Sequence, residues 1–183
     1  MRSSLGVTLV ELLTVLVVLG VLATVVAPSF RGMMVRQRVQ GVQDQLITDL
    51  QLARSEQAAR ANATTPVQVA VTFGGNAQIS CYTVHTVGAA CDCTAAPGSA
   101  CSPGAQEIRT VQVARAQGVS LAASSAGGSA ITFSPPQGTA TPTDLAITVQ
   151  GDPSGQLRTQ LSAVGSPSVC SPDGSIRGVP TCP

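Results

Sequence analysis

Met1-Arg2-Ser3-Ser4-Leu5-Gly6 is followed by Val7-Thr8-Leu9-Val10-Glu11-Leu12-Leu13 and by an apolar run that reaches Ala27 and Pro28. Glu11 is the one charged residue in this apolar stretch. A carboxylate among apolar groups is costly unless it has a partner. A cut after Gly6 would create an amino group at Val7 and make Glu11 the fifth residue of the mature chain. We expect this amine to be the partner of Glu11.

The segment resembles the start of type IV prepilins and of the pseudopilins of type II secretion. Arg2 gives the expected charge before the cut, whereas Val7 stands where the family usually has Phe. The resemblance implies that a prepilin peptidase cuts after Gly6 and methylates the amine of Val7, and that Glu11 and Pro28 serve filament assembly. The matching residues are Gly6, Thr8-Leu9, Glu11, Leu12-Leu13 and Pro28, the last as mature residue twenty-two.

A secretory signal peptide and a simple membrane anchor are the alternatives for this segment. The apolar run Leu12–Ala27 is longer than a signal-peptide core of roughly 7–15 residues. Pro28 is also a poor residue after a cut. The span Val7–Phe30 is long enough to cross a bilayer, but a simple anchor does not explain the spacing of Gly6, Glu11 and Pro28.

The helical pattern continues beyond the apolar run. Apolar residues recur every three or four positions, which is typical of an amphipathic helix: Val35, Val39, Val42, Leu46, Leu50 and Ala53. Polar residues take the other faces: Arg36, Gln37, Arg38, Gln43, Asp44 and Gln51. The sequence therefore predicts one helix from about Val7 to Ala61. Residues 7–30 are its membrane or filament-core half, residues 31–62 are its amphipathic half, and Pro28 is expected to kink or loosen it.

Residues 63–183 have the pattern of a β-domain. Alternation over Val67–Phe73 and the turn signal Gly74-Gly75-Asn76 predict a hairpin with Ile79–Val84. A long loop is expected between His85 and Gln106. The predicted fold class is α+β: after a leader at 1–6, a long N-terminal α-helix packs on an antiparallel β-sheet, which by resemblance is the pilin fold. Further short strands are predicted at Glu107–Val113, Val119–Ala122, Ile131–Ser134, Leu145–Val149 and Gln156–Val164.

An even number of cysteines outside the cytoplasm predicts disulfides; the six are Cys81, Cys91, Cys93, Cys101, Cys170 and Cys182. Cys170 and Cys182 close a short C-terminal loop and are predicted to pair. Cys91 and Cys93 are too close to pair comfortably, so each is expected to bond either Cys81 or Cys101. A zinc site with His85 is the alternative. Cys91-Asp92-Cys93 lacks the two- to four-residue spacing of zinc knuckles, so no metal ligand is assigned.

A second resemblance extends into the β-domain. Leu46 and Leu50–Ala58 resemble the second half of the long helix in the GspH/FimT-like subfamily, the H-type minor pseudopilins and T-type minor pilins. Ile131–Gly138, Leu145–Val149 and Gly155–Leu161 are similar to its closing strands. The resemblance implies a filament subunit of the bacterial inner membrane with its globular domain outside the cytoplasm. By this resemblance, the subunit belongs either to a type IV pilus, as a minor pilin, or to a type II secretion system, as a pseudopilin. The implied partners are other pilin or pseudopilin subunits, the prepilin peptidase, the inner-membrane assembly platform and the membrane itself.

DNA uptake is a third interpretation. DNA-binding T-type minor pilins carry Gly-Arg-x-Arg near the C-terminus, where this chain has Gly174-Ser175-Ile176-Arg177. Arg177 is therefore the candidate DNA contact, but the motif matches only at its ends. The ten basic residues, all Arg, face nine acidic ones, so no large basic field favours nucleic acid, and we expect weak DNA binding or none. The sequence has no enzyme motif and predicts no cofactor.

Overall fold

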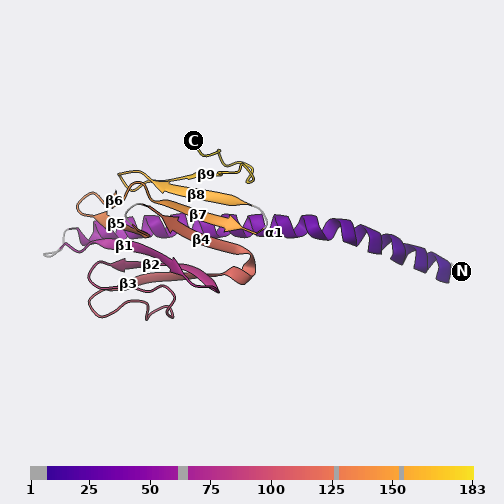
Figure 1. Ribbon diagram of the computed structural model, residues 1–183, viewed down its shortest axis with the longest axis horizontal. Coiled ribbons are helices and arrows are strands. Elements are labelled where there is room, and N and C mark those ends of the chain that lie inside the picture. The colour runs from indigo at the N-terminus through magenta and orange to yellow at the C-terminus, as the bar shows by residue number, and fades with distance from the viewer. Residues whose placement is uncertain (1–7, 62–65, 126–127, 153–154) are drawn as a thin grey trace, which may run out of the picture. The chain divides into compact units, whose positions relative to one another are not determined.

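The computed structural model describes residues 8–61, 66–125, 128–152 and 155–183, without the side chains of 25–29. Helix α1 (Leu9–Arg60) contributes to two compact units, Met1–Met34 and Val35–Pro183. Figure 1 shows α1 and the strands of the second unit. The prediction of one long helix is confirmed over the described residues.

The first unit is the N-terminal part of α1. Thr8 caps it: the Thr8 hydroxyl accepts a hydrogen bond from the Glu11 N–H at 3.3 Å. The hydroxyls of Thr14 and Thr24 donate to the carbonyls of Glu11 and Val21, so these two polar side chains are satisfied within the helix. The helix continues without a break through Pro28.

The membrane span predicted at 7–30 falls partly on Val7 and on the side chains of 25–29, outside the described residues. Within the part of the chain that the structure describes, no helix combines the length and the apolar character needed to cross a bilayer.

The second unit contains two antiparallel sheets, where a single sheet was expected (Figure 1). A 3-10 helix, η1 (Arg115–Gln117), joins β3 to β4. The five-stranded sheet has the order β3 (Glu107–Ala114), β2 (Ile79–Thr86), β1 (Val69–Gly75), β5 (Ala130–Ser134), β6 (Thr139–Thr141). The four-stranded sheet has the order β4 (Val119–Ser124), β7 (Ala146–Gly151), β8 (Gln156–Leu161), β9 (Pro167–Cys170).

One hydrophobic core joins the second part of α1 to both sheets. The predicted apolar stripe lies in it: Val35, Val39, Leu46, Leu50 and Ala53 are buried, and Val42 is partly buried against them. The strands add mainly Val, Ile and Leu, together with Phe73, Tyr82 and Phe133. The predicted packing of an amphipathic half-helix on β-structure is therefore confirmed.

The sequence pattern places Gln43 on a face other than the apolar stripe, and the structure shows that it is nevertheless buried. Gln43 is 2% exposed, and its amide donates to the hydroxyl of Thr159 on β8. Gln57 is also buried, and its side-chain oxygen accepts a hydrogen bond from the Val69 N–H of β1 at 2.8 Å. Buried polar groups need partners, and these two supply specific links from α1 to each sheet.

The strand predictions differ from the structure mainly at their ends. β1 begins at Val69, and β2 runs to Thr86, so it includes His85. The strand predicted to reach Val164 ends at Leu161 because the chain turns there: the Ser162 N–H donates to the Ser166 carbonyl at 3.0 Å. This turn leads into β9, which the sequence pattern did not predict, and β6 was also missed.

Candidate functional site

The first half of α1 carries a continuous apolar surface. Its large apolar side chains are each more than half exposed: Leu9, Val10, Leu12, Leu13, Val15, Leu16, Val17, Val18, Leu19, Val21 and Leu22. Consecutive residues on a helix point in successive directions, so this surface surrounds the helix. Exposed apolar surface of this extent marks a contact with lipid or protein.

Glu11 lies within this apolar surface. Its side chain is exposed, and it makes no hydrogen bond or ion pair with any residue that the structure describes. The carboxylate is therefore available to a group outside the described part of the chain. Gly6 and Val7, the predicted cleavage and methylation residues, lie outside the described residues. Pro28 is helical, and its side chain is not described.

Three disulfides join the six cysteines. Cys170 bonds Cys182, as predicted. The alternative left open by the sequence is resolved: Cys81 bonds Cys93, and Cys91 bonds Cys101. Cys81 is fully buried on β2, and the loop folds back so that Cys93 reaches it.

Peptide mapping under non-reducing conditions should find these three bonds. A protease that cuts before Asp separates Cys91 from Cys93 at Asp92. We expect fragment 49–91 to remain linked to 92–143 and fragment 152–172 to 173–183. If fragments 49–91 and 92–143 separate with an internal bridge each, Cys81 bonds Cys91 and the structure's pairing is wrong.

The cysteine-rich loop, residues 87–106, has a second set of restraints. The carboxylate of Glu107 accepts hydrogen bonds from the Gly98 N–H at 2.8 Å and the Ala100 N–H at 2.9 Å. Desolvation raises the pKa of Glu107, but the hydrogen bonds from Gly98, Thr110 and Ala100 together outweigh it and hold the pKa below its ordinary value. The Gln112 amide donates to the carbonyls of Cys93 and Ala95, both at 2.8 Å. The loop is thus a fixed surface on the five-stranded sheet.

The C-terminal loop between Cys170 and Cys182 holds the candidate DNA contact. Sequence reasoning missed its anchor: Ile176 is 3% exposed and belongs to the hydrophobic core. Arg177 follows it, is exposed, and has no ion pair or hydrogen bond with the described residues. The loop therefore presents Arg177 to solvent.

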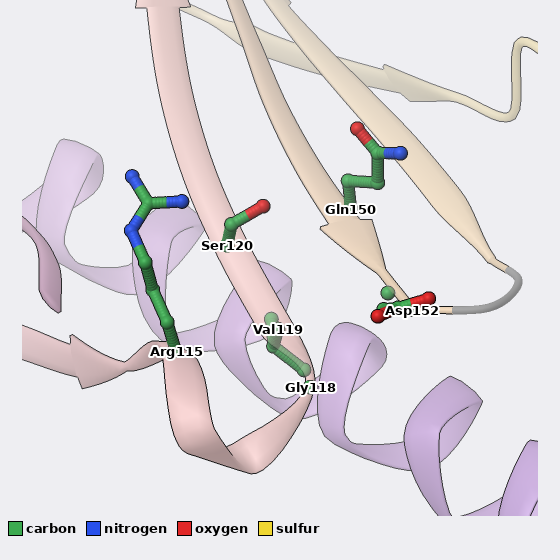
Figure 2. Close-up of a pocket in the computed structure, with 7 residues that line it drawn as sticks. Arg115, Gly118, Val119, Ser120, Gln150 and Asp152 are labelled. Carbon is green, nitrogen blue, oxygen red and sulfur yellow. The ribbon is translucent and has the colours of Figure 1, made fainter. Parts of the chain in front are cut away.

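A polar pocket of about 270 Å³ lies where β4 and β7 meet the end of η1. Figure 2 shows Arg115 and Asp152 on opposite sides of it, with Ser120 and Gln150 between them. The Arg115 guanidinium donates to the Asn76 carbonyl at 3.0 Å. None of the residues singled out from the sequence lines this pocket.

A family model described as type II transport protein GspH matches residues 43–165. The chain belongs to the GspH family. The match begins at Gln43 in the second part of α1 and extends past β8, so it covers the region in which the subfamily resemblance was found. Comparison with curated proteins and with solved structures finds no significant match.

GspH family membership assigns the chain a structural role of the pseudopilin or minor-pilin type, in type II secretion or a pilus-like system. The N-terminal features, Gly6, Glu11 and Pro28, lie before the matched region. They are therefore an independent observation from the same chain.

Proposed function

We propose that this GspH-family chain is a minor pseudopilin: a filament subunit that is cut after Gly6, methylated at Val7 and assembled at the bacterial inner membrane. The observation that carries the proposal is the exposed apolar surface of Leu9–Leu22, with Glu11 inside it and no partner for Glu11 among the described residues. The family description favours type II secretion. A minor pilin of a type IV pilus is the alternative.

The apolar half of α1 accounts for where the subunit is held before assembly and for how it packs in the filament. Burying one large aliphatic side chain is worth about 1.5–3 kcal/mol, so this surface is not stable in water. Before assembly, segment 7–30 is held in the membrane. During assembly it exchanges lipid for the same segment of neighbouring subunits.

Glu11 supplies a driving force for assembly that apolar packing alone does not provide. Lipid tails and Leu side chains are equally apolar, so the exchange has little hydrophobic driving force. A carboxylate that pairs with the amine of Val7 on a neighbouring subunit adds an attraction that exists only in the filament, and it fixes the register between helices.

DNA binding is not part of this proposal. Arg177 is exposed in a short disulfide-closed loop, but only the ends of the Gly-Arg-x-Arg motif are present and the chain is close to neutral.

The substitution Glu11→Val tests the proposal in cells that carry the rest of the system. We expect the amount of this chain in sheared filaments to fall about tenfold, because a charge-assisted hydrogen bond is worth roughly 1.5–3 kcal/mol. Membrane insertion should be preserved, since the variant removes an intramembrane charge. Immunoblots of the filament and membrane fractions give both quantities.

The matched control is Thr14→Val, three residues from Glu11 on the same helix, which removes a polar group but no charge. The Thr14 hydroxyl donates a hydrogen bond to the Glu11 carbonyl. This variant should enter filaments like the wild type. Intact-mass analysis should show a mature chain that begins at methylated Val7. Equal incorporation of Glu11→Val and wild type, or a wild-type mass that retains residues 1–6, would contradict the proposal.

A further inference from the structure

His85, Cys91 and Cys101 lie close together on the cysteine-rich loop and β2. One ring nitrogen of His85 and the sulfurs of Cys91 and Cys101 all lie within 4.8 Å of one another. His85 is 6% exposed and the two cysteines are half-buried. We propose that, when the Cys91–Cys101 disulfide is reduced, these three side chains bind a thiophilic divalent cation such as Zn²⁺. The loop then has two alternative states, one with the Cys91–Cys101 disulfide and one with the bound cation.

The donor set suits this cation. Zinc binds thiolate sulfur and imidazole nitrogen, and a Cys₂His set with a fourth position open to water is an established arrangement. Two thiolates balance the charge of one divalent cation. Cys91 and Cys93 are the close pair in the sequence, whereas the folded chain brings Cys91 next to Cys101.

The imidazole of His85 is already oriented. Its Nδ1 lies 3.0 Å from the Thr86 carbonyl, and its Nε2 lies 2.9 Å from the Thr72 hydroxyl. Metal-binding histidines usually hold their second ring nitrogen with a carbonyl or similar group. Both ring nitrogens have a partner in the oxidised chain, so the cation displaces one of these partners and the other ring nitrogen keeps its own.

The two sulfurs stay close without the bond between them. Cys91 and Cys101 face each other in an antiparallel bridge. The Asp92 N–H donates to the Ala100 carbonyl at 2.7 Å, and the Ser102 N–H donates to the Ala90 carbonyl at 3.0 Å. The carboxylate of Glu107 also holds the amides of Gly98 and Ala100. These contacts pre-organise the site after reduction.

A thiol reductant can open the Cys91–Cys101 disulfide in a balanced reaction. Two thiols reduce the Cys91–Cys101 bond, giving two protein thiols and one small-molecule disulfide. The cation then displaces a proton from each protein thiol and is held by two thiolates and His85. Cys81 and Cys93 are buried, at 0% and 4% exposure, so thiol reductants reach Cys91 and Cys101 more easily.

Cobalt titration of the full chain in detergent, reduced with a phosphine, tests the site. We expect one equivalent of Co²⁺ to bind with a thiolate-to-metal charge-transfer band, and the oxidised chain to show none. His85→Gln should weaken binding about 100-fold or more, because even the loss of an orienting partner costs 10–100-fold. Cys170→Ser/Cys182→Ser is the matched control, since this pair is distant in sequence, and it should bind like the wild type.

A second measurement needs no variant. Bound Zn²⁺ should protect Cys91 and Cys101 from a maleimide in the reduced chain, while Cys170 and Cys182 react; mass spectrometry of the peptides reads this out. The proposal is overturned if Cys91→Ser/Cys101→Ser or His85→Gln binds Co²⁺ as tightly as wild type. Equal maleimide labelling of all four cysteines with and without Zn²⁺ also overturns it.

Discussion

Asp49→Ala is expected to lower the free energy of unfolding by about 3 kcal/mol. Asp49 is 1% exposed in α1, and its Oδ2 accepts a hydrogen bond from the Tyr82 hydroxyl of β2 at 2.7 Å. Its Oδ1 lies 3.3 Å from a guanidinium nitrogen of Arg109 on β3. That contact is an ion pair without hydrogen-bond geometry. The substitution leaves the Tyr82 hydroxyl buried without an acceptor, and Arg109 loses its partner.

Urea unfolding of the full chain, followed by circular dichroism in detergent, measures this change. Asp44→Ala is the matched control, because Asp44 is exposed on the same helix, and it should change stability by less than about 0.5 kcal/mol. Asp49→Ala should destabilise the Tyr82→Phe variant less than it destabilises the wild type, since Asp49 and Tyr82 share one hydrogen bond. A cost below about 1 kcal/mol for Asp49→Ala would show that the buried pair does not hold α1 on the sheet.

The buried polar residues mark the limit of prediction from the sequence. Val39 and Leu46 could be placed in the core because apolar spacing reports a helix face directly. Gln43 could not, because its partner Thr159 is 116 residues away and its polarity indicates an exposed position. Asp49 was missed for the same reason. The strands β6 and β9 have three and four residues, too few for an alternating pattern.

Some features of the candidate site could also be predicted from the sequence, and others could not. The pairing of Cys170 with Cys182 was predictable because no other cysteine is near them in sequence. The choice between Cys81 and Cys101 as the partner of Cys93 depends on how the loop folds over β2, and no local pattern reports that. The sequence offered His85 with the cysteines only as an alternative, and it placed His85 at the start of a loop. In the structure His85 is a buried residue of β2, and it lies next to Cys91 and Cys101.

Tyr82 should resist ionisation until the domain unfolds. Burial raises its pKa most, the hydrogen bond to Asp49 and the charge of Asp49 raise it further, and Arg109 opposes them only partly. The folded-state pKa therefore lies above the unfolded value of about 10. A raised pKa gives stability that is fully present below the unfolded pKa and is lost as the pH rises above it. Above pH 10 we expect the free energy of unfolding to fall by about 1.4 kcal/mol per pH unit from this group.

The chain has one Tyr and no Trp, so the near-ultraviolet absorbance of phenolate reports Tyr82 alone. In a pH titration of the folded chain, this absorbance should rise only together with the loss of the β-sheet signal in circular dichroism. In guanidinium chloride it should rise near pH 10. Tyr82→Phe should make the free energy of unfolding depend less steeply on pH above pH 10, because the group that releases a proton on unfolding is gone. A reversible phenolate transition near pH 10 with unchanged circular dichroism would mean that Tyr82 ionises in place, and that its bond to Asp49 is not a structural contact between α1 and β2.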